Sequence, residues 1–220
     1  MNETWLLERV MWLIPLVLSL TVHEWAHAYS AFRLGDDTAA RQGRLTLNPI
    51  PHIDPIGTIL LPLLGIPFGW AKPVPVDVTR FRRDVNMRTG NVITSAAGPF
   101  SNVVLATICV LVFALLYRFA PDTMAAHESI STLLLRGFQL NVILALFNML
   151  PVPPLDGGHV AEGLMPERWR RQWEKFAAVG PAVLMAIIFL PGMMNFSLFS
   201  WPMRYATDAA YAVIRVVGGL

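Results

Sequence analysis

Two histidines and a glutamate near the N-terminus have the types and spacing that metal-dependent hydrolysis requires. His23, Glu24 and His27 form the pattern His-Glu-x-x-His. On a helix, residues i and i+4 project from one face about one turn apart, so the two imidazoles can bind the same metal ion. The glutamate is then placed to accept a proton from a water molecule whose pKa the metal has lowered. The pattern predicts one Zn²⁺ per chain, with Glu24 as the general base.

Two histidines leave a catalytic zinc one ligand short, because such sites normally have three protein ligands and an open position. The chain has a single cysteine, Cys109, inside an apolar run, so a thiolate cluster is excluded. The third ligand must come from a distant His or carboxylate. The remaining candidates are His52, Asp54, Asp156 and His159.

Asp156 is the strongest of these candidates. It follows an apolar run in a turn with three prolines and two glycines, and irregular backbone at membrane depth is tolerated only where protein or a water-filled cavity surrounds it. Asp54 precedes a proline in the manner of a helix N-cap, and His52 lies in the same proline-rich turn, where a loop histidine is the ordinary interpretation. His159 could donate a hydrogen bond to the site, although a solvated or capping role is more common.

The elements that must position these residues are membrane helices. Apolar residues make up 55% of the chain, charged residues 15%, and the mean hydropathy is +0.51. This composition predicts an all-α polytopic membrane protein with about four to six transmembrane helices. The expected spans are residues 5–32, 92–117, 133–150 and 176–190, and residues 196–217 form either a fifth span or an interfacial helix.

The whole chain, residues 1–220, is predicted to form a single integral-membrane domain with a core at 5–158 and C-terminal helices at 176–220. The N-terminus shows no signal-peptide processing site, so the first helix should be retained. Two short-range patterns separate the first two spans. Residues 43–49 alternate like a short membrane-associated β-strand, and residues 56–64 are too short to cross a bilayer and should be re-entrant or interfacial. The strand either receives an extended substrate by strand addition or only caps an edge of the fold.

The net charge of +2 comes from basic residues that lie between the apolar runs rather than in one stripe. Nucleic acid is therefore not an expected partner. Arginine and lysine concentrate between the first and second spans, within the proline-punctuated segment 69–88, and again at 168–175, so both loops should face the cytoplasm. His23 and Asp156 then fall at a similar depth near the cytoplasmic side of the membrane.

A group of small side chains in the second span should allow it to approach the first span closely. Asn102, in the same helix, needs a hydrogen-bond partner in hydrocarbon, and a packing role is favoured over direct contact with substrate or an oxyanion. The small residues are Ser95, Ala96, Ala97, Gly98 and Ser101, opposite Ala26, Ala28, Ser30 and Ala31.

Taken together, the motifs resemble the site-2 protease family of intramembrane zinc metalloproteases, in particular prokaryotic members without a PDZ or CBS domain. That family pairs His-Glu-x-x-His with N-x-x-P-x-x-x-L-D-G, which is present here from Asn148 to Gly157. The resemblance implies zinc ligands His23, His27 and Asp156, the base Glu24, and a role for Asn148 in positioning substrate or the developing oxyanion. Further matching stretches are Gly43 to Pro49, Gly69 to Pro75 and Ala97 to Asn102.

The resemblance implies regulated cleavage of single-span membrane proteins in a prokaryotic cell membrane, with the active site towards the cytoplasm. The lipid bilayer and single-span substrates are the expected partners. The alternative is a non-proteolytic membrane protein that binds or transports metal with the same ligands. Transport would require polar residues that continue across the bilayer, whereas here the histidines and acidic residues collect at one depth.

Overall fold

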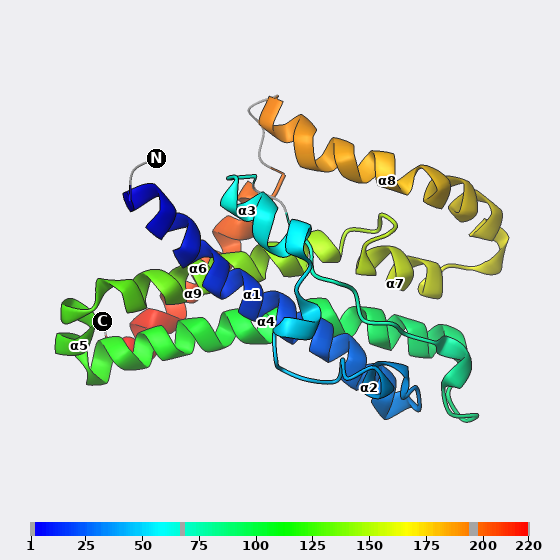
Figure 1. Ribbon diagram of the computed structural model, residues 1–220, viewed down its shortest axis with the longest axis horizontal. Coiled ribbons are helices and arrows are strands. Elements are labelled where there is room, and N and C mark those ends of the chain that lie inside the picture. Colours follow the sequence, from blue (N-terminus) through cyan, green and yellow to red (C-terminus); the bar gives the residue numbers. More distant parts are fainter. Residues whose placement is uncertain (1–2, 67–68, 194–197, 220) are drawn as a thin grey trace.

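A computed structural model describes residues 3–66, 69–193 and 198–219, and within them all regular structure is helical (Figure 1). The α-helices in chain order are α1 (Glu3–Leu34), α2 (Thr38–Arg41), α3 (Leu61–Leu63), α4 (Met87–Phe119), α5 (Pro121–Ala126), α6 (Glu128–Asn148), α7 (Asp156–Leu164), α8 (Arg170–Met193) and α9 (Ser200–Gly218). Shorter helical turns are η1 (Ile50–His52), η2 (Pro55–Leu60), η3 (Val78–Arg80) and η4 (Glu167–Trp169).

Three segments of the described chain are long and apolar enough to cross a membrane: α4, α6 and residues Glu167–Leu190, which comprise η4 and most of α8. They correspond to the predicted spans at 92–117, 133–150 and 176–190. The expected total of four to six spans is not confirmed. Of the other two long helices, α1 carries the polar His-Glu-x-x-His motif and α9 carries three charged residues.

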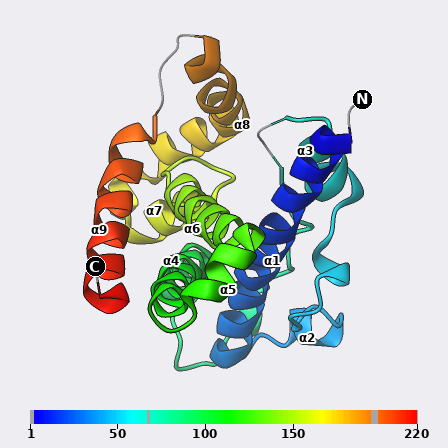
Figure 2. The same ribbon diagram turned by 90° about the vertical axis from the view of Figure 1, so that its left-hand side faces the viewer.

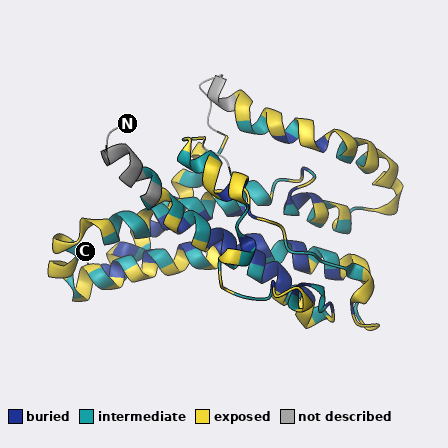
Figure 3. Ribbon diagram, in the orientation of Figure 1, coloured by how far each residue is buried: buried dark blue, intermediate teal, exposed yellow. Residues whose placement is uncertain are grey.

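The centre of the molecule is the crossing of α1 over α4 and α6, which lie side by side (Figures 1 and 2). Ala28 and Ala31 of α1 are fully buried, and Ser95 and Gly98 of α4 are buried as well. Figure 3 shows the buried residues concentrated at this crossing. Small side chains let two helix backbones approach closely, and the predicted small-residue contact between the first two spans is confirmed.

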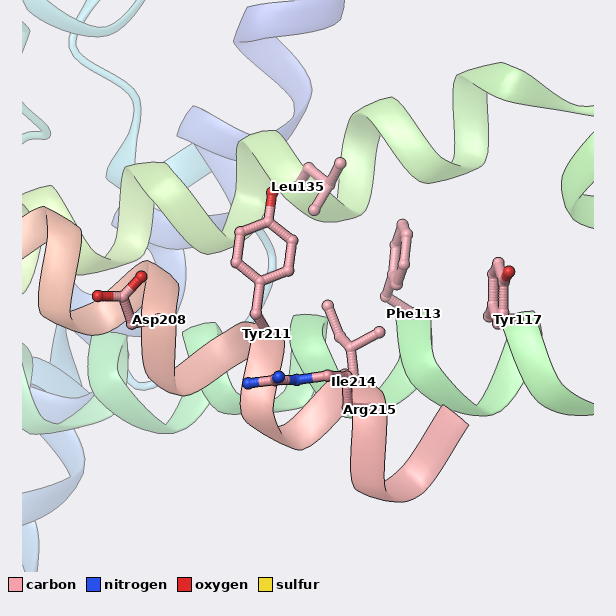
Figure 4. Close-up of a pocket in the computed structure, with 7 residues that line it drawn as sticks. All are labelled: Phe113, Tyr117, Leu135, Asp208, Tyr211, Ile214 and Arg215. Carbon is pink, nitrogen blue, oxygen red and sulfur yellow. The ribbon is translucent and has the colours of Figure 1, made fainter. Parts of the chain in front are cut away.

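The C-terminal helix α9 packs along α4 through Ala210 and Ile214, which contact Ala106, Val110 and Ala114. The sequence did not decide whether this C-terminal segment is a span or an interfacial helix. In the structure it packs against α4, which is a candidate spanning helix. Between α9, α4 and α6 runs a crevice of about 690 Å³, into which Tyr211 and Ile214 of α9 point (Figure 4). Its lining does not include any of the candidate catalytic residues, and consists of Phe113, Tyr117, Leu135, Asp208, Tyr211, Ile214 and Arg215.

Helix α8 contacts the rest of the molecule mainly through the turn that precedes α7. Leu184 of α8 packs on Val152 and Leu155 of that turn. Gly180 is required at this contact, because a Cβ on it would overlap the carbonyl of Pro153. The proline-rich turn is thus held between α6, which it follows, and α8, which covers it.

The predicted β-strand at residues 43–49 is wrong, because the chain bends at residues 45–47 and the described residues contain no strand. Local side-chain hydrogen bonds take its place. Asn48 N donates to Thr46 Oγ1 at 3.0 Å, and Ile50 N donates to Asn48 Oδ1 at 3.1 Å. Such bonds offer the backbone an alternative to pairing with a second strand.

The predicted helix start at Asp54 is confirmed. Its carboxylate accepts from Ile56 N at 3.0 Å and from Gly57 N at 2.7 Å, and Pro55 is the first residue of η2. An N-cap carboxylate satisfies amide groups that have no partner inside the helix. The position of η2 and α3 as a re-entrant or interfacial element stays a prediction.

Candidate active site

Helix α1 places the histidine pair and the glutamate inside the protein. His23, Glu24 and His27 are 5%, 9% and 8% exposed. The two histidines occupy one face of the helix, and their Nε2 atoms lie 3.0 Å apart. Ionisable groups are costly in such surroundings and are normally retained for function.

Asp156 reaches the histidines from α7, which begins at this residue directly after the proline-rich turn. Its Oδ2 lies 3.2 Å from His23 Nε2, and its Oδ1 lies 3.3 Å from His27 Nε2. The position depends on Gly157, because a Cβ there would overlap the backbone of Met149 and lie 2.5 Å from Leu150 O. A glycine at this point lets the first turn of α7 press against the end of α6, so that the carboxylate lies against α1.

Both histidines are held through the opposite ring nitrogen. His23 Nδ1 lies 2.6 Å from Asn102 Oδ1, and His27 Nδ1 lies 2.7 Å from the carbonyl oxygen of Thr94. An acceptor at Nδ1 places the proton there and leaves a lone pair on Nε2, which is the arrangement that a metal ligand needs. The two lone pairs then point towards Asp156.

Direct contact of Asn102 with substrate or an oxyanion, the less favoured of the two roles considered from the sequence, does not fit this placement. Asn102 is 0% exposed, and both ends of its amide are used inside the bundle. Its position behind the imidazole of His23 makes it a support for a candidate ligand. This agrees with the packing role that the sequence favoured, with the added detail that the packing partner is His23.

The residues present fit a metal ion. The three donor atoms of His23, His27 and Asp156 all lie within 4.8 Å of one another, and this is the one such group among the described residues. Space for it depends on Gly98 of α4, since a Cβ there would overlap His27 Nε2 and lie 2.7 Å from His23 Cε1. Two imidazoles and one carboxylate with a position left for water match a catalytic zinc site.

The candidate base Glu24 is oriented by an extended segment, residues 71–77, that crosses α1. Val74 N donates to Glu24 Oε2 at 2.8 Å. The segment is fixed on both sides of this bond: Lys72 N donates to the carbonyl of His52 at 2.9 Å, and Asp77 N donates to Asp36 Oδ2 at 2.8 Å. Within the described chain, the second carboxylate oxygen of Glu24 has no hydrogen-bond partner and can receive a water molecule.

The other candidate ligands lie away from this group. His52, the last residue of η1, is 1% exposed and its Nε2 lies 2.9 Å from the carbonyl oxygen of Thr46. Asp54 caps η2. His159 is exposed on α7, as expected for a solvated residue. Asn148 lies at the end of α6 and donates to Leu144 O at 3.0 Å, so its proposed role towards substrate stays a prediction.

Some residues at the site were not identified from the sequence. The Val74 amide and the Thr94 carbonyl are backbone groups, and no residue type marks them in advance. Asn141 is different, because an asparagine in the middle of an apolar span is a recognisable signal. It is 1% exposed and bonds to Asn102 at 2.8 Å.

A comparison with protein-family models matches residues 58–191 to the peptidase family M50. The matched region includes α4, α6 and Asp156, while the His-Glu-x-x-His motif lies before it. The chain belongs to this family of peptidases, and the resemblance to the site-2 proteases is confirmed. With its three apolar helices it is a membrane protein that acts on protein substrates.

Among similar chains is YwhC of Bacillus subtilis, which is named as a zinc metalloprotease; it is 42% identical over 194 residues, covering 88% of this chain and 85% of YwhC. Rip2 of Mycolicibacterium smegmatis, also named as a zinc metalloprotease, is 31% identical over 205 residues, covering 90% of this chain and 74% of Rip2. Rip2 of Mycobacterium tuberculosis is 33% identical over 184 residues, covering 82% and 65% of the two chains. No solved structure matches the chain.

Proposed function

We propose that this protein is an intramembrane zinc metalloprotease that hydrolyses peptide bonds within or near the transmembrane segments of single-span membrane proteins. The observation that carries the proposal is the convergence of His23, His27 and Asp156 beside Glu24 at the crossing of helices that form a membrane bundle. The zinc metalloprotease names of the relatives support the same chemistry.

His23, His27 and Asp156 would hold the metal. A bound Zn²⁺ supplies Lewis acidity, which lowers the pKa of water and polarises a carbonyl group. Glu24 accepts the proton of the attacking water with the oxygen that Val74 leaves free, and later delivers it to the leaving amide nitrogen. The hydrogen bond from Val74 keeps the carboxylate in one orientation during both transfers.

The polar environment of the site supports water entry from one side of the membrane. We place that side in the cytoplasm, because the arginines of segment 80–88 precede α4 and those of segment 168–175 follow α7, on the side where Asp156 lies. A helical substrate must unwind locally before its peptide bond becomes accessible. Single-span substrates with helix-destabilising residues near the cut are therefore expected.

Metal storage or transport is the weaker alternative. A binding site alone has no use for a buried glutamate that is oriented by a backbone amide. Membership of a peptidase family also favours hydrolysis.

The test compares wild-type protein with Glu24→Gln. Because the amide cannot accept the proton, cleavage should fall by several orders of magnitude while bound zinc stays near one equivalent. Single-span proteins captured by the Glu24→Gln variant are reconstituted with wild-type enzyme, and mass spectrometry locates each cut. Cuts confined to soluble segments, or equal turnover by the variant, would contradict the proposal.

A further inference from the structure

A line of buried hydrogen bonds runs from His23 through α4 to α6. Asn102 Oδ1 lies 2.6 Å from His23 Nδ1, and Asn102 Nδ2 donates to Asn141 Oδ1 at 2.8 Å. Asn141 Nδ2 in turn donates to the carbonyl of Gly137 and to Ser19 Oγ, both at 2.8 Å. Asn102, Asn141 and Ser19 are 0%, 1% and 1% exposed. We call Asn102 and Asn141 the amide chain.

The direction of the amide chain is fixed at its far end. A backbone carbonyl can only accept, so the carbonyl of Gly137 forces Asn141 to turn its NH₂ group towards it. The oxygen of Asn141 then faces Asn102 and accepts from its NH₂ group at 2.8 Å, whereas the other acceptor of that group, the carbonyl of Ser19, lies at the longer distance of 3.5 Å. The oxygen of Asn102 is left facing His23, whose Nδ1 must carry the proton.

If the amide of Asn102 were reversed, its NH₂ group would face Nδ1 of His23. The proton of the imidazole would then be on Nε2, which could no longer bind a metal ion. His27 does not need such a chain, because its Nδ1 bonds directly to the acceptor-only carbonyl of Thr94. Of the two histidines, only His23 bonds to a side-chain amide, in which a rotation can exchange the positions of the oxygen and the NH₂ group.

We propose that Asn141 is a positioning residue for the metal centre. Through Asn102, it holds His23 in the tautomer whose Nε2 is free for the metal. The inference rests on the metal centre proposed above, and it explains why two amides occupy a part of the bundle where apolar side chains would pack without any need for hydrogen bonds. Ser19 supports the chain as a second acceptor for the NH₂ group of Asn141.

The matched variants are Asn141→Thr and Asn141→Val, which have the same shape and differ in one hydroxyl. A threonine hydroxyl in a helix can donate to the carbonyl four residues earlier, here Gly137, and accept from Asn102, so it preserves the direction of the chain. Valine removes it. We expect Asn141→Val to weaken zinc binding by about 10–100-fold, as for other partners of metal-binding histidines, and Asn141→Thr to recover most of the loss.

Adding Asn102→Asp to the Asn141→Val variant gives a sharper readout. A carboxylate can only accept, so it should keep the proton on Nδ1 of His23 without help from Asn141 and restore zinc affinity. Affinity is measured with zinc alone by chelator competition on the purified full chain. The absorption spectrum of the Co²⁺-loaded protein reports ligation by histidine, and thermal unfolding without metal reports stability.

Equal zinc affinity of the threonine and valine variants would overturn the proposal, and so would a failure of Asn102→Asp to restore binding. If the valine variant folds poorly, restored binding in the double variant still supports the proposal, and unrestored binding still overturns it. Failure of the metal centre itself is distinguishable, because His23→Ala and Asp156→Ala would then keep their zinc.

Discussion

At the residue scale, the two histidines of the candidate site are held by hydrogen bonds at the ring nitrogen that faces away from Asp156. His23 and His27 each have an acceptor at Nδ1, and their Nε2 atoms face the carboxylate of Asp156. The carboxylate therefore completes a set of three donors and also contributes the negative charge that a divalent cation requires in a site with little water.

Asp156→Ala should lose both zinc and activity, and Asp156→Asn should bind zinc more weakly because it keeps the shape but not the charge. Metal content of the purified protein after mild chelation measures this. His159→Ala is the matched control, since it lies on the same helix, is exposed, and should keep a full equivalent of zinc. Full zinc in the Asp156 variants would show that the third ligand lies elsewhere.

At the element scale, the site depends on the extended segment 71–77 and on the close contact between α1 and α4. The segment brings one amide to the candidate base, and α4 brings a residue without a side chain to the two imidazoles. Each feature can be changed at a single residue without altering a candidate ligand.

Val74→Pro removes the amide proton that orients Glu24, within a segment that already contains Pro73 and Pro75. A hydrogen bond to a charged group contributes roughly 1.5–3 kcal/mol, so kcat should fall by about tenfold or more while zinc content is unchanged. Val76→Pro is the control, because within the described residues its amide has no hydrogen-bond acceptor. Equal kcat values for the two variants would argue against the orienting role.

Gly98→Ala should weaken zinc binding by at least about tenfold, because the new methyl group displaces imidazoles that are already held at Nδ1. Gly218→Ala in α9 is the matched control. A Cβ there comes no nearer than 3.7 Å to its neighbours, and alanine is the better helix former by about 1 kcal/mol. Chelator competition on both variants provides the measurement, and unchanged affinity in Gly98→Ala would mean that the helices can separate without cost.

At the scale of the whole molecule, α4 connects two loops that should lie on opposite sides of the membrane. Arg82 precedes the helix and His127 follows it after α5, and both are exposed. The basic residues flank the end at which α4 begins, so we expect this end to lie in the cytoplasm.

Cysteine labelling of intact cells tests the orientation in a Cys109→Ala background, which removes the single natural thiol. Arg82→Cys should react only after the membrane is permeabilised, and His127→Cys should react with an impermeant reagent added outside. Labelling of position 82 from outside would reverse the topology and place the candidate site on the other face of the membrane.

Features that depend on neighbouring residues could be predicted from the amino-acid sequence. Helical periodicity fixed the relation of His23, Glu24 and His27, and the Asp54-Pro55 pair marked a helix start. Hydropathy predicted four spans, and three of them correspond to helices that are long and apolar enough to cross a membrane. These patterns are local, and the backbone geometry of a helix is the same wherever it lies. The expected strand at 43–49 failed because nearby side chains competed for its hydrogen bonds.

Contacts between groups that are distant in the sequence are defined by the packing of the helices. Asp156 reaches the histidines because Gly157 lets α7 press against α6, and Val74 reaches Glu24 because the extended segment is anchored on both sides. The role of Asn102 required the contacts of three helices, since an asparagine in an apolar span signals a hydrogen bond without naming its partner. Its partner depends on close packing between helix faces, which no local pattern records.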